Sequence, residues 1–196
     1  MNRRDILKFA GGAAMNAALV GGLGAAMLSS ATATTAPSAP RIGPSGVQPA
    51  ARRLSFVNTH TGETFRGAYC EGGVYQSDAL SEINRVMRDH RSNEVHAIDR
   101  NLLDQLTDLH VHLGASQPYQ IISGYRSPAT NAALHANSSG VATRSLHMDG
   151  RAIDVRIAGV DLIRLRDTAI ANQRGGVGYY QASDFVHLDT GRVRRW

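Results

Sequence analysis

Residues 145–154 read Ser145-Leu-His-Met-Asp-Gly-Arg-Ala-Ile-Asp154, and this stretch predicts a loop, a sharp turn and a strand. Gly150 permits the turn because glycine adopts backbone conformations that other residues avoid. The apolar positions that follow indicate a strand over residues 152–157. Asp154 lies in the middle of that strand, where a carboxylate is costly unless it is paired, hydrogen-bonded or bound to a cation. His147 and Asp154 are therefore candidate metal ligands.

A second stretch with the same character lies near the end of the sequence, at Ser183-Asp-Phe-Val-His-Leu-Asp189. Strand alternation puts His187 and Asp189 on one face and the apolar residues between them on the other. His147, Asp154 and His187 together could supply three ligands to one zinc ion. Three protein ligands with a fourth position left for water or substrate are typical of a catalytic zinc site.

Two other interpretations of these residues stay open. Each histidine could be a hydrogen-bonded core residue, and Asp154 could pair with Arg151 or Arg156. A rival metal pair is His110 with His112, but positions i and i+2 of a predicted helix point to nearly opposite sides. The occurrence of three candidates in this spacing favours the first site.

The bulk composition narrows the class of protein. A chain of 196 residues is long enough for one domain with a proper core. Its formal net charge of +5 suits an anionic partner, such as nucleic acid or the cell wall. No Lys/Arg-rich run carries interleaved aromatic residues, so we expect no nucleic-acid partner. The single cysteine, Cys70, cannot form a disulfide within the chain.

The first residues are typical of an export signal. Asn2-Arg-Arg-Asp-Ile-Leu-Lys8 carries a twin arginine, a Gly/Ala-rich uncharged run follows over residues 9–28, and Ala31-Thr-Ala33 is a small-x-small cleavage site. We expect a twin-arginine signal peptide over residues 1–33, with only transient membrane contact, and a flexible linker over residues 34–53. The alternative is a membrane anchor, since about 20 apolar residues can span a bilayer.

The rest of the chain, residues 54–196, predicts one α+β domain with a small, mainly antiparallel sheet and packed helices. Strands are expected at 54–58 and 63–69 as a hairpin, at 119–123 and 152–157, and at 177–180 and 185–189 as a closing hairpin. Helices are expected at 78–90, 100–113, 129–135 and 161–172. Residues 136–146 are rich in Ser, Gly and Thr and predict a flexible loop.

The full set of motifs resembles a known family. Ser123-Gly-Tyr-Arg-Ser-Pro128, residues 145–154, Gly175-Gly-Val-Gly-Tyr-Tyr180 and residues 185–191 with Trp196 look like the MepK-like murein endopeptidase branch of the D-Ala-D-Ala carboxypeptidase and hedgehog-like zinc peptidases. The resemblance covers most of residues 54–196. It implies a hedgehog/DD-peptidase-like fold and a periplasmic monomer that hydrolyses peptidoglycan cross-links, in the nearest branch those between two diaminopimelate residues.

The resemblance also implies residue roles. His147, Asp154 and His187 would bind one zinc ion. Arg126 would face the substrate as a binding and catalytic residue, and Ser145 would line the cleft. Asp184, three positions before the last histidine ligand, would act as general base. Asp189 would orient a ligand histidine.

Two alternative functions remain on the same scaffold. One is a D,D- or L,D-carboxypeptidase, which would release a terminal amino acid and leave cross-links intact. The other is a non-catalytic peptidoglycan-binding module whose zinc is structural or absent.

Overall fold

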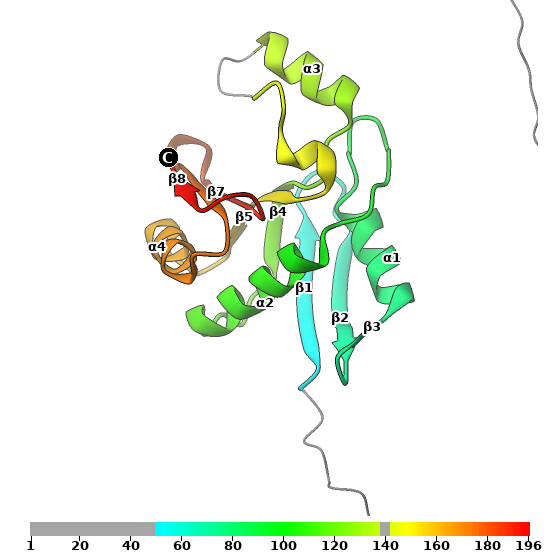
Figure 1. Cartoon of the computed structure of the whole chain (residues 1–196), viewed down its shortest axis with the longest axis vertical. Helices are drawn as coiled ribbons and strands as arrows, with labels where there is room; N and C mark the ends of the chain where they lie inside the picture. Colours follow the sequence, from blue (N-terminus) through cyan, green and yellow to red (C-terminus); the bar gives the residue numbers. More distant parts are fainter. Residues whose placement is uncertain (1–49, 138–141) are drawn as a thin grey trace, which may run out of the picture. The chain divides into compact units, whose positions relative to one another are not determined.

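The computed structural model describes residues 50–137 and 142–196 (Figure 1). The expected signal peptide at 1–33 and residues 34–49 of the expected linker lie outside these described residues. The first strand begins at Arg52, two residues before the expected start of the domain. Within the described ranges, no helix combines the length and the apolar character needed to cross a membrane.

Eight strands form one sheet within the described residues. They are β1 (Arg52–Asn58), β2 (Thr64–Glu71), β3 (Val74–Tyr75), β4 (Tyr119–Ser123), β5 (Ala152–Ile157), β6 (Gly176–Tyr180), β7 (Phe185–Asp189) and β8 (Arg194–Arg195). Their spatial order is β3-β2-β1-β4-β5-β7-β6-β8. The predicted hairpins β1–β2 and β6–β7 are both present and antiparallel.

The expectation of a small, mainly antiparallel sheet needs correction, because the sheet is larger and mixed. β1 pairs with β4 in parallel, and β6 pairs with β8 in parallel. In sequence, β2, β3 and two helices separate β1 from β4, which gives the long connection that parallel pairing requires. The second pairing uses a short strand after β7 that the sequence pattern did not reveal. The combination of α-helices with one sheet is confirmed.

Four α-helices accompany the sheet in the described residues: α1 (Ser77–Val86), α2 (Arg100–Leu113), α3 (Pro128–Asn137) and α4 (Leu162–Asn172). The carboxylate of Asp99 caps α2 by accepting from the Asn101 amide, and Gly114 ends α2 in the left-handed conformation. Helix α1 ends four residues before the predicted end at His90. The reason is tertiary, since the Met87 carbonyl accepts a hydrogen bond from the Tyr125 amide.

The two faces of the central strands differ in chemistry. Ile153 and Val155 of β5, like Val186 and Leu188 of β7, are fully buried in the apolar core that the helices cover. The alternate residues, Asp154 and His187, point to the other face because side chains alternate along a strand. The same rule that builds the core therefore places polar side chains together on its reverse side.

Candidate metal centre

A short helical turn delivers His147 to this polar face. Residues Leu146–Asp149 form a 3-10 helix, and the Ser145 hydroxyl accepts a hydrogen bond from the His147 amide at 3.4 Å. Gly150 ends the turn with φ of 65°, and a Cβ there would collide with the backbone oxygen of Ala97. Only glycine meets both conditions, so the predicted turn is confirmed with a reason that lies partly in tertiary packing.

The structure brings the three predicted ligands together. Asp154 lies directly opposite His187 in the β5–β7 pairing, and the turn adds His147 from the side. Asp154 Oδ1 lies 2.8 Å from His187 Nδ1 and 3.4 Å from His147 Nε2, and the two nitrogens are 3.2 Å apart. Ligands at the usual zinc distances of about 2.0–2.1 Å would stand roughly 3.3 Å apart in a tetrahedral site. The triangle of donor atoms therefore fits a zinc-sized ion.

The outer nitrogen of each histidine is already engaged. His147 Nδ1 lies 2.7 Å from the Gly124 carbonyl oxygen, and His187 Nε2 lies 3.1 Å from Asp189 Oδ2. Both oxygens only accept, so these two ring nitrogens carry the protons and donate them. In the neutral form of each ring, His147 Nε2 and His187 Nδ1 are therefore the nitrogens whose lone pairs face the centre of the triangle, as metal ligands must.

Asp189, which accepts from His187 Nε2, is itself held by several hydrogen bonds. It is fully buried, and its Oδ1 accepts from the amides of Gly176 at 2.9 Å and Gly191 at 2.8 Å. Arg194 donates to both carboxylate oxygens, at 3.1 and 2.7 Å. Burial alone would raise the pKa of Asp189, but the hydrogen bonds from His187, Arg194 and the two amides hold it well below its usual range. The carboxylate is therefore charged and fixed in position.

The ligand side chains are also electrostatically coupled. Burial opposes a charge on His187, yet its hydrogen bonds to Asp154 and Asp189 outweigh that and raise its pKa to about 8. Burial would likewise raise the pKa of Asp154, but the two histidines lower it well below its usual range. A cation would take over the role of these protons, so the donor set suits a positively charged ligand.

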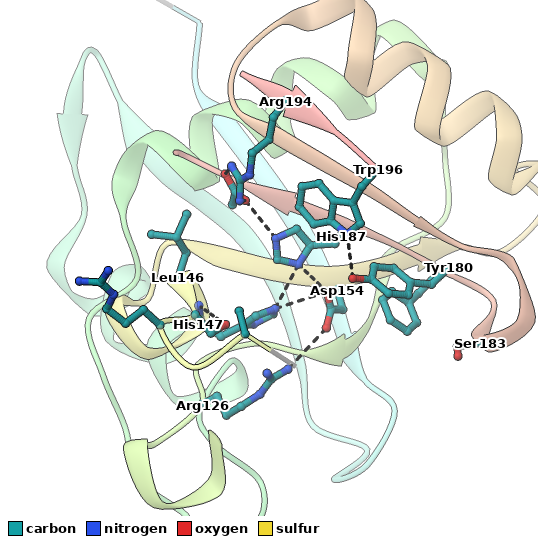
Figure 2. Close-up of a pocket in the computed structure, with 14 residues that line it drawn as sticks. Arg126, Leu146, His147, Asp154, Tyr180, Ser183, His187, Arg194 and Trp196 are labelled. Carbon is teal, nitrogen blue, oxygen red and sulfur yellow. Dashed lines mark hydrogen bonds and ion pairs between the residues drawn. The ribbon is translucent and has the colours of Figure 1, made fainter. Parts of the chain in front are cut away.

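A pocket of about 510 Å³ opens over the three side chains (Figure 2). Figure 2 shows Arg126 and Leu146 on one side of the ligands, and Tyr180, Ser183 and Trp196 on the other. A concave site with a few convergent polar groups is the usual form of a small-ligand or active site. The remaining lining residues are Ala142, Arg144, Ser145, Phe185, Asp189 and Arg194.

Arg126 is the charged group closest to the ligands on the first side. Its side chain is mostly buried, and Nη2 lies 3.8 Å from Asp154 Oδ2 and 3.3 Å from the Ser123 hydroxyl. Among the described residues, none accepts a hydrogen bond from Arg126 Nε. Desolvation lowers the pKa of Arg126, and the charge of Asp154 partly offsets that effect. Arg126 also lines the pocket, where its guanidinium can face an anionic oxygen of a ligand.

Ser145 lines the pocket as predicted, but its hydroxyl also caps the turn that carries His147. Asp184 is placed differently. Its side chain is 64% exposed, and its carboxylate accepts from Arg156 Nη1 at 2.7 Å. Asp184 is not among the residues that line the pocket. The general-base role that the resemblance implies for it has no support in this geometry.

The rival histidine pair does not form a site in the part of the chain that the structure describes. His110 Nε2 is bonded to the Gln117 carbonyl, and the His147–Asp154–His187 group is the sole three-residue cluster found there. Sequence reasoning missed Tyr180 and Arg194 as pocket residues. Tyr180 could have been suspected, since it alternates with Gly178 on the polar face of β6.

Three buried candidate ligands that line an open pocket beside an arginine are typical of a metal-dependent hydrolase. Comparison with known proteins gives the family: residues 47–196 match the one described as peptidoglycan L,D-endopeptidase MepK. The chain is 41% identical to the Escherichia coli K12 protein of that name over 196 residues, which is all of this chain and 97% of the relative. It is 42% identical over 149 residues to the probable Haemophilus influenzae counterpart, covering 76% of this chain and 80% of the relative. The chain belongs to this family of peptidoglycan endopeptidases.

Proposed function

We propose that this protein is a zinc-dependent peptidoglycan L,D-endopeptidase that hydrolyses stem-peptide cross-links during cell-wall remodelling. The observation that carries the proposal is the triangle of His147 Nε2, His187 Nδ1 and Asp154 Oδ1, with both outer imidazole nitrogens engaged. Two imidazoles and one carboxylate form a ligand set typical of hydrolytic zinc sites. The names of the Escherichia coli and Haemophilus influenzae relatives point to the same activity.

Each residue of the pocket then has a role. A zinc ion at the triangle would supply Lewis-acid chemistry, polarising a peptide carbonyl and lowering the pKa of water. Arg126 would hold a substrate carboxylate or the oxygen that gains charge, because its guanidinium lines the pocket beside Asp154. Ser145 would support the cleft wall and the turn that carries His147. Asp189 would keep His187 in the tautomer that binds metal.

The substrate class follows from the relatives and from the pocket. The nearest branch of the family suggests the cross-link between two diaminopimelate residues, whose side chains carry carboxylates. A pocket whose lining includes Arg126 and Arg144 suits such an anionic peptide. We infer that the partner is peptidoglycan and that the protein acts as a monomer.

The cellular route is inferred from the sequence. A twin-arginine signal at residues 1–33, followed by a linker to about residue 53, would deliver the folded domain to the periplasm, where peptidoglycan lies. The assignment to the hedgehog-like, D-Ala-D-Ala carboxypeptidase fold rests on the sequence motifs.

Digestion of purified cross-linked muropeptides by the zinc-loaded protein tests the proposal. Mass analysis should show cross-linked dimers converted to monomers, and a chelator or His147→Ala should abolish the conversion. A released terminal amino acid with intact dimers would indicate a carboxypeptidase instead. Undiminished cleavage by a zinc-free His147→Ala protein would contradict the metal mechanism.

A further inference from the structure

Tyr180 and Trp196 form a pair on the pocket wall opposite Arg126 (Figure 2). The indole Nε1–H of Trp196 donates a hydrogen bond to the Tyr180 hydroxyl at 2.9 Å. The Trp196 ring lies 5.3 Å from the ring of the candidate ligand His187, measured between centroids. The pair is therefore close to the candidate metal position, although the family resemblance assigned neither residue a role.

Trp196 is held rigidly although it is half exposed. The residue is 51% exposed, yet its backbone is paired on both sides. Its amide donates to the Val177 carbonyl at 3.2 Å, and its carbonyl accepts from the Tyr179 amide at 3.0 Å. The Arg194 guanidinium lies 4.9 Å from its ring. A large aromatic surface that is both exposed and fixed beside a catalytic pocket is pre-organised for contact with a ligand.

Gly178 leaves room for the Trp196 ring on strand β6. It lies opposite His187 in the β6–β7 pairing, on the polar face of the sheet. A Cβ at this position would stand only 2.7 Å from the Trp196 ring, so the indole could not lie on the strand if residue 178 had a side chain. The fit between Gly178 and Trp196 shows that the indole position is specified by the fold.

The Tyr180 hydroxyl can still donate one hydrogen bond. Its oxygen accepts from the Trp196 indole, and no described residue accepts its proton. Its ring stacks on Phe185 at a centroid distance of 4.6 Å, which limits its movement. The free O–H group therefore belongs to a fixed side chain on the pocket wall.

We infer that the Tyr180 hydroxyl donates a hydrogen bond to the scissile peptide carbonyl of the bound cross-link, and that Trp196 is a positioning residue that holds this hydroxyl in place. The inference rests on the proposed function and adds a catalytic residue to it. The hydrogen bond strengthens as the carbonyl oxygen gains negative charge during attack on the peptide bond. Tyr180 and Arg126 then contact the reacting peptide from opposite sides.

Tyr180→Phe tests the hydroxyl alone, because the ring and its stacking on Phe185 remain. One pre-organised donor to such an oxygen is worth about 100-fold in kcat, so we expect a loss of that order with KM changed less than tenfold. Zinc content and melting temperature should stay at wild-type values.

Tyr179→Phe is the matched control. It removes the same atom one residue away, on the opposite face of β6, where the Tyr179 ring packs against Arg166. We expect wild-type kinetics from it. If kcat/KM of Tyr180→Phe lies within threefold of this control, the inference is overturned while the proposed function stands.

Binding can be followed without turnover, because Trp196 is the only tryptophan of the sequence. Its fluorescence should respond when chelator-treated protein is titrated with a muropeptide dimer joined by an L,D cross-link. Tyr180→Phe should weaken this binding about three- to tenfold, the usual range for one neutral hydrogen bond. If the wild type does not cleave the dimer, the proposed function fails, and the titration alone tests the role of Tyr180. Equal affinities of the wild type and Tyr180→Phe for the dimer, or no fluorescence response, would then overturn the inference too.

Trp196→Phe separates the positioning role, since it removes the indole N–H and keeps a ring on Gly178. We expect kcat to fall about three- to tenfold in the wild-type background, because the hydroxyl loses its anchor. In the Tyr180→Phe background the same change should have no further effect on kcat, since there is no hydroxyl left to position. Independent, multiplicative losses in the double variant would overturn the positioning role.

Discussion

Asp189→Asn is the substitution for which the structure makes the sharpest prediction about metal binding. The change is nearly isosteric, and the amide oxygen can still accept from Gly176 and Gly191. The amide nitrogen would then replace Oδ2, which now accepts from His187 Nε2 at 3.1 Å and from Arg194 Nη2 at 2.7 Å. Two donors would face the new NH₂ group, so neither hydrogen bond can persist.

The consequence for His187 is a change of tautomer. Its Nε2 could accept from the new amide only if the ring proton moved to Nδ1, the nitrogen that faces Asp154 and the metal position. A protonated nitrogen cannot bind a metal, so one of the three ligands is lost in the favoured tautomer. Removal of an outer partner of a ligand histidine costs roughly 10–100-fold in metal affinity. That range corresponds to about 1.4–2.7 kcal/mol.

Competition with a chromogenic zinc chelator measures this affinity directly. Asp184→Asn is the control, because it makes the same chemical change in the same segment at a carboxylate that lies outside the pocket. The control should bind zinc like the wild type. Zinc affinity of Asp189→Asn within threefold of the wild type would refute the tautomer argument.

Three further predictions follow from single contacts. Asp184→Asn should keep kcat within about twofold, since the carboxylate pairs with Arg156 at the surface and surface pairs contribute little; a 100-fold loss in the muropeptide assay would restore the general-base interpretation. Gly150→Ala should lower the unfolding free energy by about 2–4 kcal/mol in urea titration, through a left-handed backbone and a collision with the Ala97 carbonyl; an unchanged midpoint would contradict this. Desolvation would raise the pKa of the buried Asp89, but hydrogen bonds from the Thr130 side chain and from the amides of Ser127 and Arg91 hold it well below its usual range. Its stabilisation is therefore present above about pH 4 and is lost as the pH falls toward the folded-state pKa, so Asp89→Asn should be less stable at neutral pH and lose less stability on acidification; parallel stability–pH curves would count against it.

Local patterns predicted most of the elements near the site. Alternation of apolar and polar residues indicated β5 and β7, and it put Asp154 and His187 on the face away from the core. Helix α2 was predicted with its observed ends, because its apolar periodicity and the glycine that follows it are local signals. Such features depend on neighbours a few residues apart, so the sequence contains the information directly.

Features that depend on distant partners were predicted poorly. The end of α1 was placed at His90 instead of Val86, because the Met87 carbonyl bonds to Tyr125, nearly forty residues away. The parallel pairing of β1 with β4 and the short strand β8 were absent from the prediction. Strand pairing depends on the path of the whole chain, and a two-residue strand has no periodicity to detect.

By itself, the sequence determined which residue types could bind a metal and where the chain would turn to present them: His147 before Gly150, Asp154 and His187 in mid-strand. Only the tertiary structure decided which atoms meet. Hydrogen bonds to the Gly124 carbonyl and to Asp189 determine which histidine nitrogens face the centre. Asp184 pairs with Arg156 and does not line the pocket. The β6–β8 pairing likewise brings Trp196 to Tyr180 across sixteen positions. Hydrogen-bond partners that are far apart in sequence become neighbours only when the sheet has formed, so no local pattern could have predicted them.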